Sequence, residues 1–242
     1  MRQLTLILLL IALPVFGSEL IPHEAEYKVQ ISIAGGKLTT RLSEADGVYT
    51  ANHVIKPTGI ARIAGGGRID ETSTFRLMDD DIVPVGYRSV DELSSDKSHA
   101  DVLFTETGRI QGTVNGAAVD WELPDDTFDR VAIQYKLMLA LAQGDEATAY
   151  TMYDVDEFKD LDIRFLGEKT VKTRAGSFTA TGVQHQRKGS SRVTTLWCVE
   201  ELGYLPVLIE QHRKGKLRLK ASLKSYKPLV SPARSQAAAT GT

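Results

Sequence analysis

Residues 25–33 have the sequence Ala-Glu-Tyr-Lys-Val-Gln-Ile-Ser-Ile, in which apolar and polar side chains alternate at every position. A period of two is typical of a β-strand that has one buried and one solvated face. The pair Gly35-Gly36 follows and can turn the chain. The same alternation recurs at residues 217–224, Leu-Arg-Leu-Lys-Ala-Ser-Leu-Lys, near the other end of the sequence. These stretches predict a protein built from half-buried strands.

The middle of the chain continues this pattern. Asn115-Gly116, a strong signal for a two-residue hairpin, is followed by alternating residues from Ala117 to Leu123. Further short alternating stretches lie between residues 37 and 213, and most are separated only by turns. A parallel α/β fold is disfavoured because it needs helices between successive strands. We therefore predict a mainly β protein with a single antiparallel curved sheet or an incomplete β-barrel.

One segment, about residues 127–143, has a helical period instead. Its apolar residues recur at i, i+3, i+4 and i+7, Asp125 to Thr127 supply capping oxygens, and Gly144 follows the last apolar residue. The apolar face is wide, so we expect this amphipathic helix to cover the concave face of the sheet. A shorter helical turn is predicted at residues 57–64, where a glycine-rich loop is the alternative.

The N-terminus resembles an export signal. Arg2 precedes an apolar run from Leu4 to Leu13, which is shorter than the ~20 residues that cross a bilayer. We expect residues 1–17 to be a cleaved signal peptide, with a short membrane anchor as the alternative. Residues 18–230 would then form a single β-rich domain and residues 231–242 a disordered tail. The expected location is the periplasm of a Gram-negative bacterium.

Composition excludes several functions. A net charge of -2 over 242 residues is not that of a general nucleic-acid binder. Cys198 is the only cysteine, which excludes an internal disulfide, and the five histidines show no metal-ligand spacing. The sequence contains neither a G-x-S-x-G motif nor a phosphate-binding loop. We expect no catalytic residues, no metal, no cofactor and no enzymatic activity.

The wide helical face suggests a binding site for an apolar ligand. A curved sheet covered by such a helix can enclose a cavity that holds a lipid or an acyl chain. The alternative is that the same residues simply fill the core. The candidate lining residues are Val131, Tyr135, Met138 and Leu139 on the helix, with Trp121 and Trp197 on strands.

The C-terminal hairpin is rich in basic residues, among them Arg218, Lys220 and Lys224. Charges on strands commonly prevent edge-to-edge aggregation. The functional alternative is a contact with anionic lipid headgroups or with an acidic envelope protein.

Several motifs resemble an exported bacterial family that is known only as a domain of unknown function. They are residues 82–88 (Ile-Val-Pro-Val-Gly-Tyr-Arg), 173–178 (Thr-Arg-Ala-Gly-Ser-Phe), 194–197 (Thr-Thr-Leu-Trp), 203–207 (Gly-Tyr-Leu-Pro-Val) and 217–220 (Leu-Arg-Leu-Lys). The resemblance covers roughly residues 22–228. The end of the chain is also similar to periplasmic lipoprotein carriers of the LolA/LolB type, which implies an incomplete barrel wrapped round helices, with a cavity for acyl chains.

Two functions follow as hypotheses. The first is a periplasmic carrier or sensor that binds a lipid or acyl chain in a barrel-like cavity. The alternative is a non-enzymatic interaction or scaffold protein of the cell envelope, which would use a strand edge or the basic hairpin.

Overall fold

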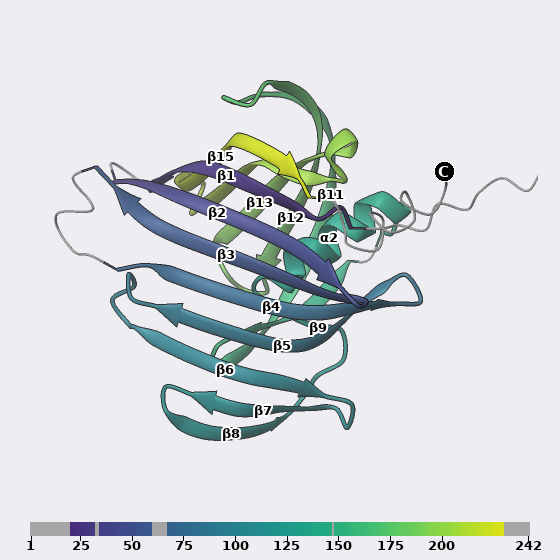
Figure 1. Cartoon of the computed structure of the whole chain (residues 1–242). Helices are drawn as coiled ribbons and strands as arrows, with labels where there is room; N and C mark the ends of the chain where they lie inside the picture. Colours follow the sequence, from purple (N-terminus) through teal and green to yellow (C-terminus); the bar gives the residue numbers. More distant parts are fainter. Residues whose placement is uncertain (1–19, 32–33, 60–66, 147, 230–242) are drawn as a thin grey trace, which may run out of the picture.

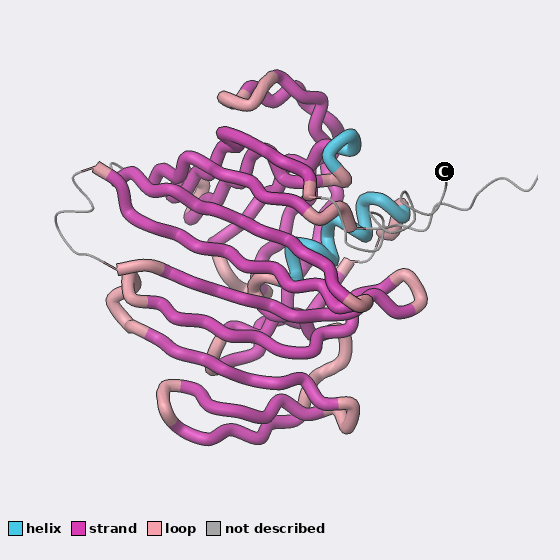
Figure 2. Tube along the Cα trace, in the orientation of Figure 1, coloured by secondary structure: helices cyan, strands magenta, loops and turns pink. Residues whose placement is uncertain are grey.

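The computed structural model describes residues 20–31, 34–59, 67–146 and 148–229. Their strands form one sheet, which bends strongly so that its two halves face each other across one α-helix (Figures 1 and 2). A short 3-10 helix, η1 Glu200–Leu202, connects two of the strands. The predicted fold class, a mainly β protein with one curved, unclosed sheet, is confirmed. The strands are β1 His23–Ile31, β2 Ala34–Ala45, β3 Val48–Thr58, β4 Ile69–Met78, β5 Asp81–Asp91, β6 Ser98–Thr105, β7 Arg109–Val114, β8 Ala117–Glu122, β9 Thr127–Asp129, β10 Ala149–Asp154, β11 Glu157–Lys172, β12 Ser177–Arg187, β13 Arg192–Val199, β14 Leu205–Arg213 and β15 Lys216–Pro228.

The sheet is an almost unbroken meander. The strand order runs from β8 back to β1, then to β15, and from there back to β9. Strands β1 and β15 pair with each other, so the two ends of the domain meet in the middle of the sheet. Every pair of neighbours is antiparallel except β9 and β10, which are parallel. This order leaves β8 and β9 as the two edge strands.

The unpaired boundary between Ala117–Glu122 (β8) and Thr127–Asp129 (β9) is called the seam below. These two strands follow each other in sequence but are not hydrogen-bonded neighbours in the sheet. Backbone hydrogen bonds close a complete β-barrel all the way round. Here the described strands make a barrel-like wall with one opening, and side chains must close it.

The helix α2 spans Ala132–Gln143 and begins five residues later than the sequence pattern predicts. Residues 127–129 are extended because they pair with Thr151–Tyr153 of β10. The carboxylate of Asp129 accepts hydrogen bonds from the backbone N–H groups of Val131 and Ala132, at 2.8 and 2.9 Å. At the other end Gly144 adopts a left-handed φ of 67°, as expected for the residue that ends the helix.

The period-two pattern decides which side of each strand is buried. In β1 the side chains of Ala25, Tyr27 and Val29 are buried, whereas Ile31 at the strand end is 48 % exposed. In β15 the buried members of the alternating set are Ala221 and Leu223. The core therefore lies between the inner faces of the bent sheet and α2.

Three expectations concern residues at the limits of the described chain. The predicted signal peptide, residues 1–17, and the predicted tail, residues 231–242, lie outside the described residues. The predicted helical turn at 57–64 is wrong at its first two residues, because Pro57 and Thr58 pair with Gly36 and Gly35 as part of β3. Residues 60–64 of that turn also lie outside the described part.

Candidate ligand-binding site

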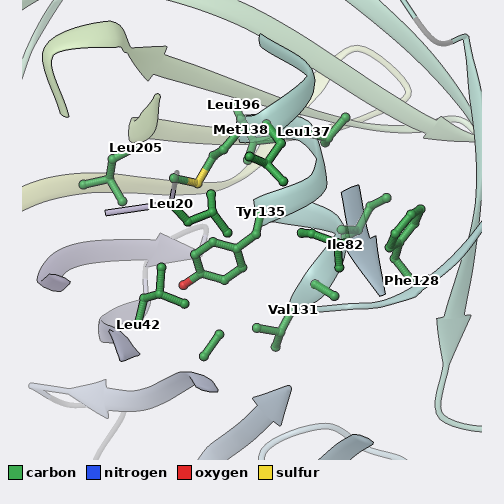
Figure 3. Close-up of a cluster of buried hydrophobic side chains, with 14 of the residues drawn as sticks. Leu20, Leu42, Ile82, Phe128, Val131, Tyr135, Leu137, Met138, Leu196 and Leu205 are labelled. Atoms are coloured by element: carbon green, nitrogen blue, oxygen red, sulfur yellow. The ribbon is translucent and has the colours of Figure 1, made fainter. Parts of the chain in front are cut away.

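The helix α2 lies inside the curve of the sheet and is covered on nearly all sides. Figure 3 shows Tyr135 and Met138 projecting from it among Leu42, Leu196 and Leu205, which come from three different strands. The consecutive residues Ala132 to Ala140 are all buried. A helix with one apolar stripe would leave its other face in water. The sequence of α2 is therefore that of a core helix.

The structure brings four of the six predicted ligand residues together. Val131, Tyr135, Met138 and Leu139 lie on or next to α2, and each is at most 2 % exposed. They pack against the core of the bent sheet. These side chains would touch a ligand only if α2 moved.

Trp197 lies apart from the α2 residues. It points away from the face of β13 that carries the buried Leu196 and Cys198, as alternation requires. Its ring lies on Gly182, where a Cβ atom would come within 2.8 Å of it. The Lys169 ammonium stands 3.6 Å from the ring centroid, a cation–π contact.

Trp121 of β8 belongs to an aromatic cluster at the seam. Its ring centroid is 6.4 Å from that of Tyr153 on β10 and 6.5 Å from that of Phe158 on β11. Tyr153 also makes edge contacts with Tyr87 and Phe104, at 5.9 and 6.0 Å. Rings from both edges of the sheet therefore close the seam where the backbone does not.

Arg130, between β9 and α2, makes polar contacts with strands on both sides of the seam. Its guanidinium forms ion pairs with Glu71 of β4 at 2.6 Å and with Asp154 of β10 at 3.0 Å. It also donates hydrogen bonds to the hydroxyl oxygens of Tyr87 and Ser89 on β5, both at 3.1 Å. One side chain thus connects the two halves of the sheet across the seam.

The neighbouring Asp129 is fully buried and joins α2 to β4. Its carboxylate accepts a hydrogen bond of 2.6 Å from the Ser73 hydroxyl, besides those from the helix N-terminus. Burial raises the pKa of Asp129 to about 6. An acid whose folded-state pKa is raised stabilises the fold less as the pH rises through that value.

Polar contacts also hold the helix to the turn between β4 and β5. The ammonium of the buried Lys136 lies 2.7 Å from the Asp81 carboxylate. It also stands 5.4 Å from the centroid of the Tyr150 ring. Further along the helix, the Gln143 amide donates a hydrogen bond of 2.6 Å to the backbone oxygen of Asp80.

Two histidines, His23 and His53, also lie beside α2. Nε2 of His53 on β3 lies 3.3 Å from the Tyr135 hydroxyl oxygen. The His23 ring lies 6.4 Å from the Tyr135 ring, and its Nδ1 is 2.8 Å from the backbone oxygen of Ile21. Burial, and then the nearby His23, lower the pKa of His53 to about 3. Burial also lowers the pKa of His23. Both rings are therefore neutral at pH 7.

This depressed pKa predicts a loss of stability in acid. The unfolded chain protonates a histidine near pH 6.5, whereas folded His53 takes up its proton only near pH 3. The stabilising contribution is therefore complete above about pH 6.5 and is lost as the pH falls, by up to about 1 kcal/mol per pH unit for a partly exposed group. Urea unfolding at a series of pH values should show a shallower acid slope in His53→Gln than in the wild type. The exposed His99→Gln is the matched control, and an unchanged slope in His53→Gln contradicts the prediction.

Two cavities of about 420 Å³ each open near this site, and neither is lined by a residue of α2. The first is a groove over β1, β2, β3 and β15, where Glu24, Arg41 and Tyr226 form part of the wall. The second, called the rim pocket below, lies between Arg130 and the ends of β10 to β14. Its positively charged side chains are Arg130, Lys159, Arg187, Arg192 and Arg213. His185 also lines it, but burial lowers the pKa of this histidine to about 4, so its ring is neutral at pH 7.

The predicted hairpin residues lie on the outer side of β15. Arg218, Lys220 and Lys224 are exposed, and their neighbours Ala221 and Leu223 face the core. Lys224 forms an ion pair with Glu26 of β1, which Lys37 also contacts.

Sequence reasoning missed Arg130 and Lys136, although a lysine inside the apolar run of a helix is a signal that could have indicated a buried ion pair.

Comparison with known proteins identifies a family. A family model described as "Protein of unknown function (DUF3108)" matches residues 24–221. This confirms the predicted resemblance to a domain of unknown function, whereas the similarity to LolA/LolB stays a prediction. No curated protein matches the sequence.

Several solved structures are similar to this chain at low identity, and the first of those described here shares its fold. A beta-barrel-like protein of the domain of unknown function DUF1849 from Brucella abortus is 11 % identical, with a TM-score of 0.58, over 88 % of this chain and 99 % of its own. MucB in the Pseudomonas aeruginosa MucA/MucB complex is 12 % identical with a TM-score of 0.39, over 91 % of this chain and 56 % of its own. A Bacteroides fragilis protein described as exported, with a YmcC-like fold, is 14 % identical with a TM-score of 0.35, over 86 % and 96 %.

Proposed function

The chain belongs to the DUF3108 family of proteins of unknown function, and from this premise we propose that it is an exported, non-enzymatic protein that binds an apolar ligand. The ligand would be a lipid or an acyl chain, and the protein its carrier or sensor in the periplasm. The apolar run before Pro14 supports export. Within the described residues, no helix combines the length and hydropathy needed to cross a membrane.

The observation that carries this proposal is the unpaired seam beside a core helix. The described strands enclose α2 almost completely, yet β8 and β9 form no ladder with each other. The edge strand β9 leads directly into α2, so movement of the helix and opening of the seam are mechanically linked. Opening there breaks side-chain contacts but no strand pairing between β8 and β9. The ligand would enter through the seam and occupy the apolar surface that α2 covers.

The free energy gained by burying an acyl chain can offset the cost of displacing α2. Displacing α2 exposes apolar surface at a cost of about 25 cal/mol per Å². An acyl chain that covers the same surface regains about 0.8 kcal/mol for each methylene group it buries. A chain of a dozen methylene groups would therefore offset about 10 kcal/mol of opening cost. Ligands much shorter than this would leave the helix in place.

Lipid binding can be tested on the folded, exported protein. Native mass spectrometry should show a bound lipid after purification without detergent, and a fluorescent fatty acid should bind in a saturable way. Absence of both signals from folded protein would rule the proposal out.

A variant of a helix anchor makes the test sharper. Gln143→Ala removes the contact with Asp80 and leaves the core intact, because Gln143 is exposed. If binding requires α2 to move, this variant should bind the fatty acid several-fold more tightly, since opening becomes easier by about 1 kcal/mol. Gln111→Ala on the exposed face of β7 is the matched control and should bind as the wild type does. Equal affinity in all three proteins would exclude a binding mode in which α2 moves.

A second candidate function, an envelope interaction protein, is favoured by one observation. Strand β8 is an edge of the sheet and is largely exposed, so its free backbone groups could pair with a strand of a partner. Arg218 and Lys220 offer a charged alternative on the outer side of β15. Their reversal to glutamate should abolish crosslinking to an acidic partner, and unchanged crosslinking would remove this surface from consideration.

A further inference from the structure

Along β12 and β13, the side chains on the inner face of the sheet change from apolar to positively charged. The inward side chains of β12 are, in order, Val183, His185 and Arg187, and those of β13 are Leu196, Thr194 and Arg192. Register places Val183 opposite Leu196, and His185 opposite Thr194. Arg213 of β14 pairs with Arg192 and extends the last row. The concave face is therefore apolar toward its middle and cationic at this rim.

The rim pocket occupies the cationic end of this face. Its volume is about 420 Å³, and its charged lining consists of five arginine or lysine side chains with a single carboxylate, Asp154. The hydroxyls of Ser190, Ser191 and Thr194 and the amide of Gln211 also line it. Its apolar part is formed by Met152 and the buried Leu161.

Carboxylates compensate only part of this positive charge. Arg130 is paired with Glu71 and Asp154, and Lys159 with Asp154 and Glu157. Arg187 lies 3.4 Å from Glu157. Within the described part of the chain, neither Arg192 nor Arg213 has a carboxylate within ion-pair distance. Two guanidinium groups thus remain uncompensated at the pocket.

The lowered pKa of Lys159 is consistent with an excess of positive charge in the rim pocket. Its pKa is lowered to about 8 by burial and by the positive charges of Arg187, Arg130 and Arg192. A bound anion would counteract that field. It would therefore bind more tightly below about pH 8, where Lys159 carries its charge.

We infer that the rim pocket binds a phosphate-type anion, with Arg192 and Arg213 as its principal ligands and the serine and threonine hydroxyls as additional donors. Guanidinium groups donate paired hydrogen bonds to phosphate oxygens, and two uncompensated cations match a dianion. The pocket is larger than a phosphate group needs, and its apolar side at Met152 and Leu161 faces the core. The anion would therefore be attached to a larger, partly apolar molecule.

This inference deepens the proposed function and rests on it for the identity of the natural ligand. The pocket would hold the charged end of a lipid whose chain lies under α2. The same phosphate chemistry also occurs in small soluble phosphates. The affinity of the pocket for an anion can be measured without any lipid.

Calorimetric titration of the full folded protein with inorganic phosphate and pyrophosphate, at low salt, tests the pocket. Vesicles of phosphatidylcholine with and without phosphatidic acid test the lipid source. The variant Arg192→Gln/Arg213→Gln removes the two uncompensated charges, and both side chains are exposed enough to be replaced without disturbing the core. Arg76→Gln/Arg88→Gln removes the same charge from the exposed outer side of β4 and β5 and is the matched control.

We expect the Arg192→Gln/Arg213→Gln variant to bind at least tenfold more weakly, and the control to bind as the wild type does. Binding of pyrophosphate alone would support a soluble phosphate, and binding only of phosphatidic acid vesicles would support a lipid headgroup. Absence of all anion binding by the folded wild type would overturn the inference, as would equal losses in the two variants. Anion binding without any acyl-chain binding would keep the pocket and reject the lipid carrier.

Discussion

Replacement of Arg130 by methionine should lower the free energy of unfolding by about 3–5 kcal/mol. The guanidinium is the partner of Glu71 at 2.6 Å and of Asp154 at 3.0 Å, and both carboxylates are largely buried. Removing one partner of such a pair leaves the other charge without compensation in a medium of low polarity. Here that charge is Glu71, because Asp154 keeps its ion pair with Lys159. The same change also removes the polar connection across the seam. Urea unfolding at pH 7 measures the loss directly.

The matched control is the exposed ion pair between Arg109 and Asp120 on β7 and β8. Arg109→Met should lower the free energy of unfolding far less than Arg130→Met, because water screens exposed pairs. In addition, hydrogen exchange of β9 and α2 should increase in Arg130→Met more than exchange of β1 to β3. Equal losses of stability in the two variants would show that Arg130 does not hold the seam.

Loss of a ring from the aromatic cluster at the seam should destabilise the fold about as much as loss of Arg130. Tyr153→Ala should lower the free energy of unfolding by about 3–5 kcal/mol, because the fully buried ring contacts Tyr87, Phe104, Trp121 and Phe158. The cavity left behind would separate β8 from β10, which backbone pairing does not hold together. Thermal or urea unfolding provides the measurement.

Tyr153→Phe separates packing from hydrogen bonding at the same position. The Tyr153 hydroxyl is buried and has no hydrogen-bond partner among the described residues. Its removal should therefore leave stability unchanged or raise it slightly, since an unpaired buried hydroxyl is costly. A large loss in Tyr153→Phe would mean that the hydroxyl, not the ring, holds the seam.

The sheet was predictable because its signal is local. Alternation in residues 25–31 and 217–224 and the turn at Asn115-Gly116 each act over a few residues, and the strands they predict are present. The start of the helix was predicted too early, because residues 127–129 pair with β10, more than twenty residues away. Helical periodicity in a short segment carries no information about such a distant partner.

The candidate site was predictable only in its apolar part. Tyr135 and Met138 stood out by their spacing along one helix. Arg130 joins partners 59 and 24 residues away, and Arg187, Arg192 and Arg213 meet only through the register of three strands. In the sequence, these arginines look like ordinary charged residues at the ends of strands. Their convergence depends on how the sheet bends.

Hydrogen exchange of the α2 amides, residues 132–143, in the presence and absence of a saturating long-chain fatty acid tests the ligand-binding proposal most directly. If the ligand replaces the helix in the core, protection of α2 should fall at least tenfold on binding, while that of β1 to β3 stays unchanged. A ligand that binds without lowering this protection, or a folded protein that binds none, would contradict it.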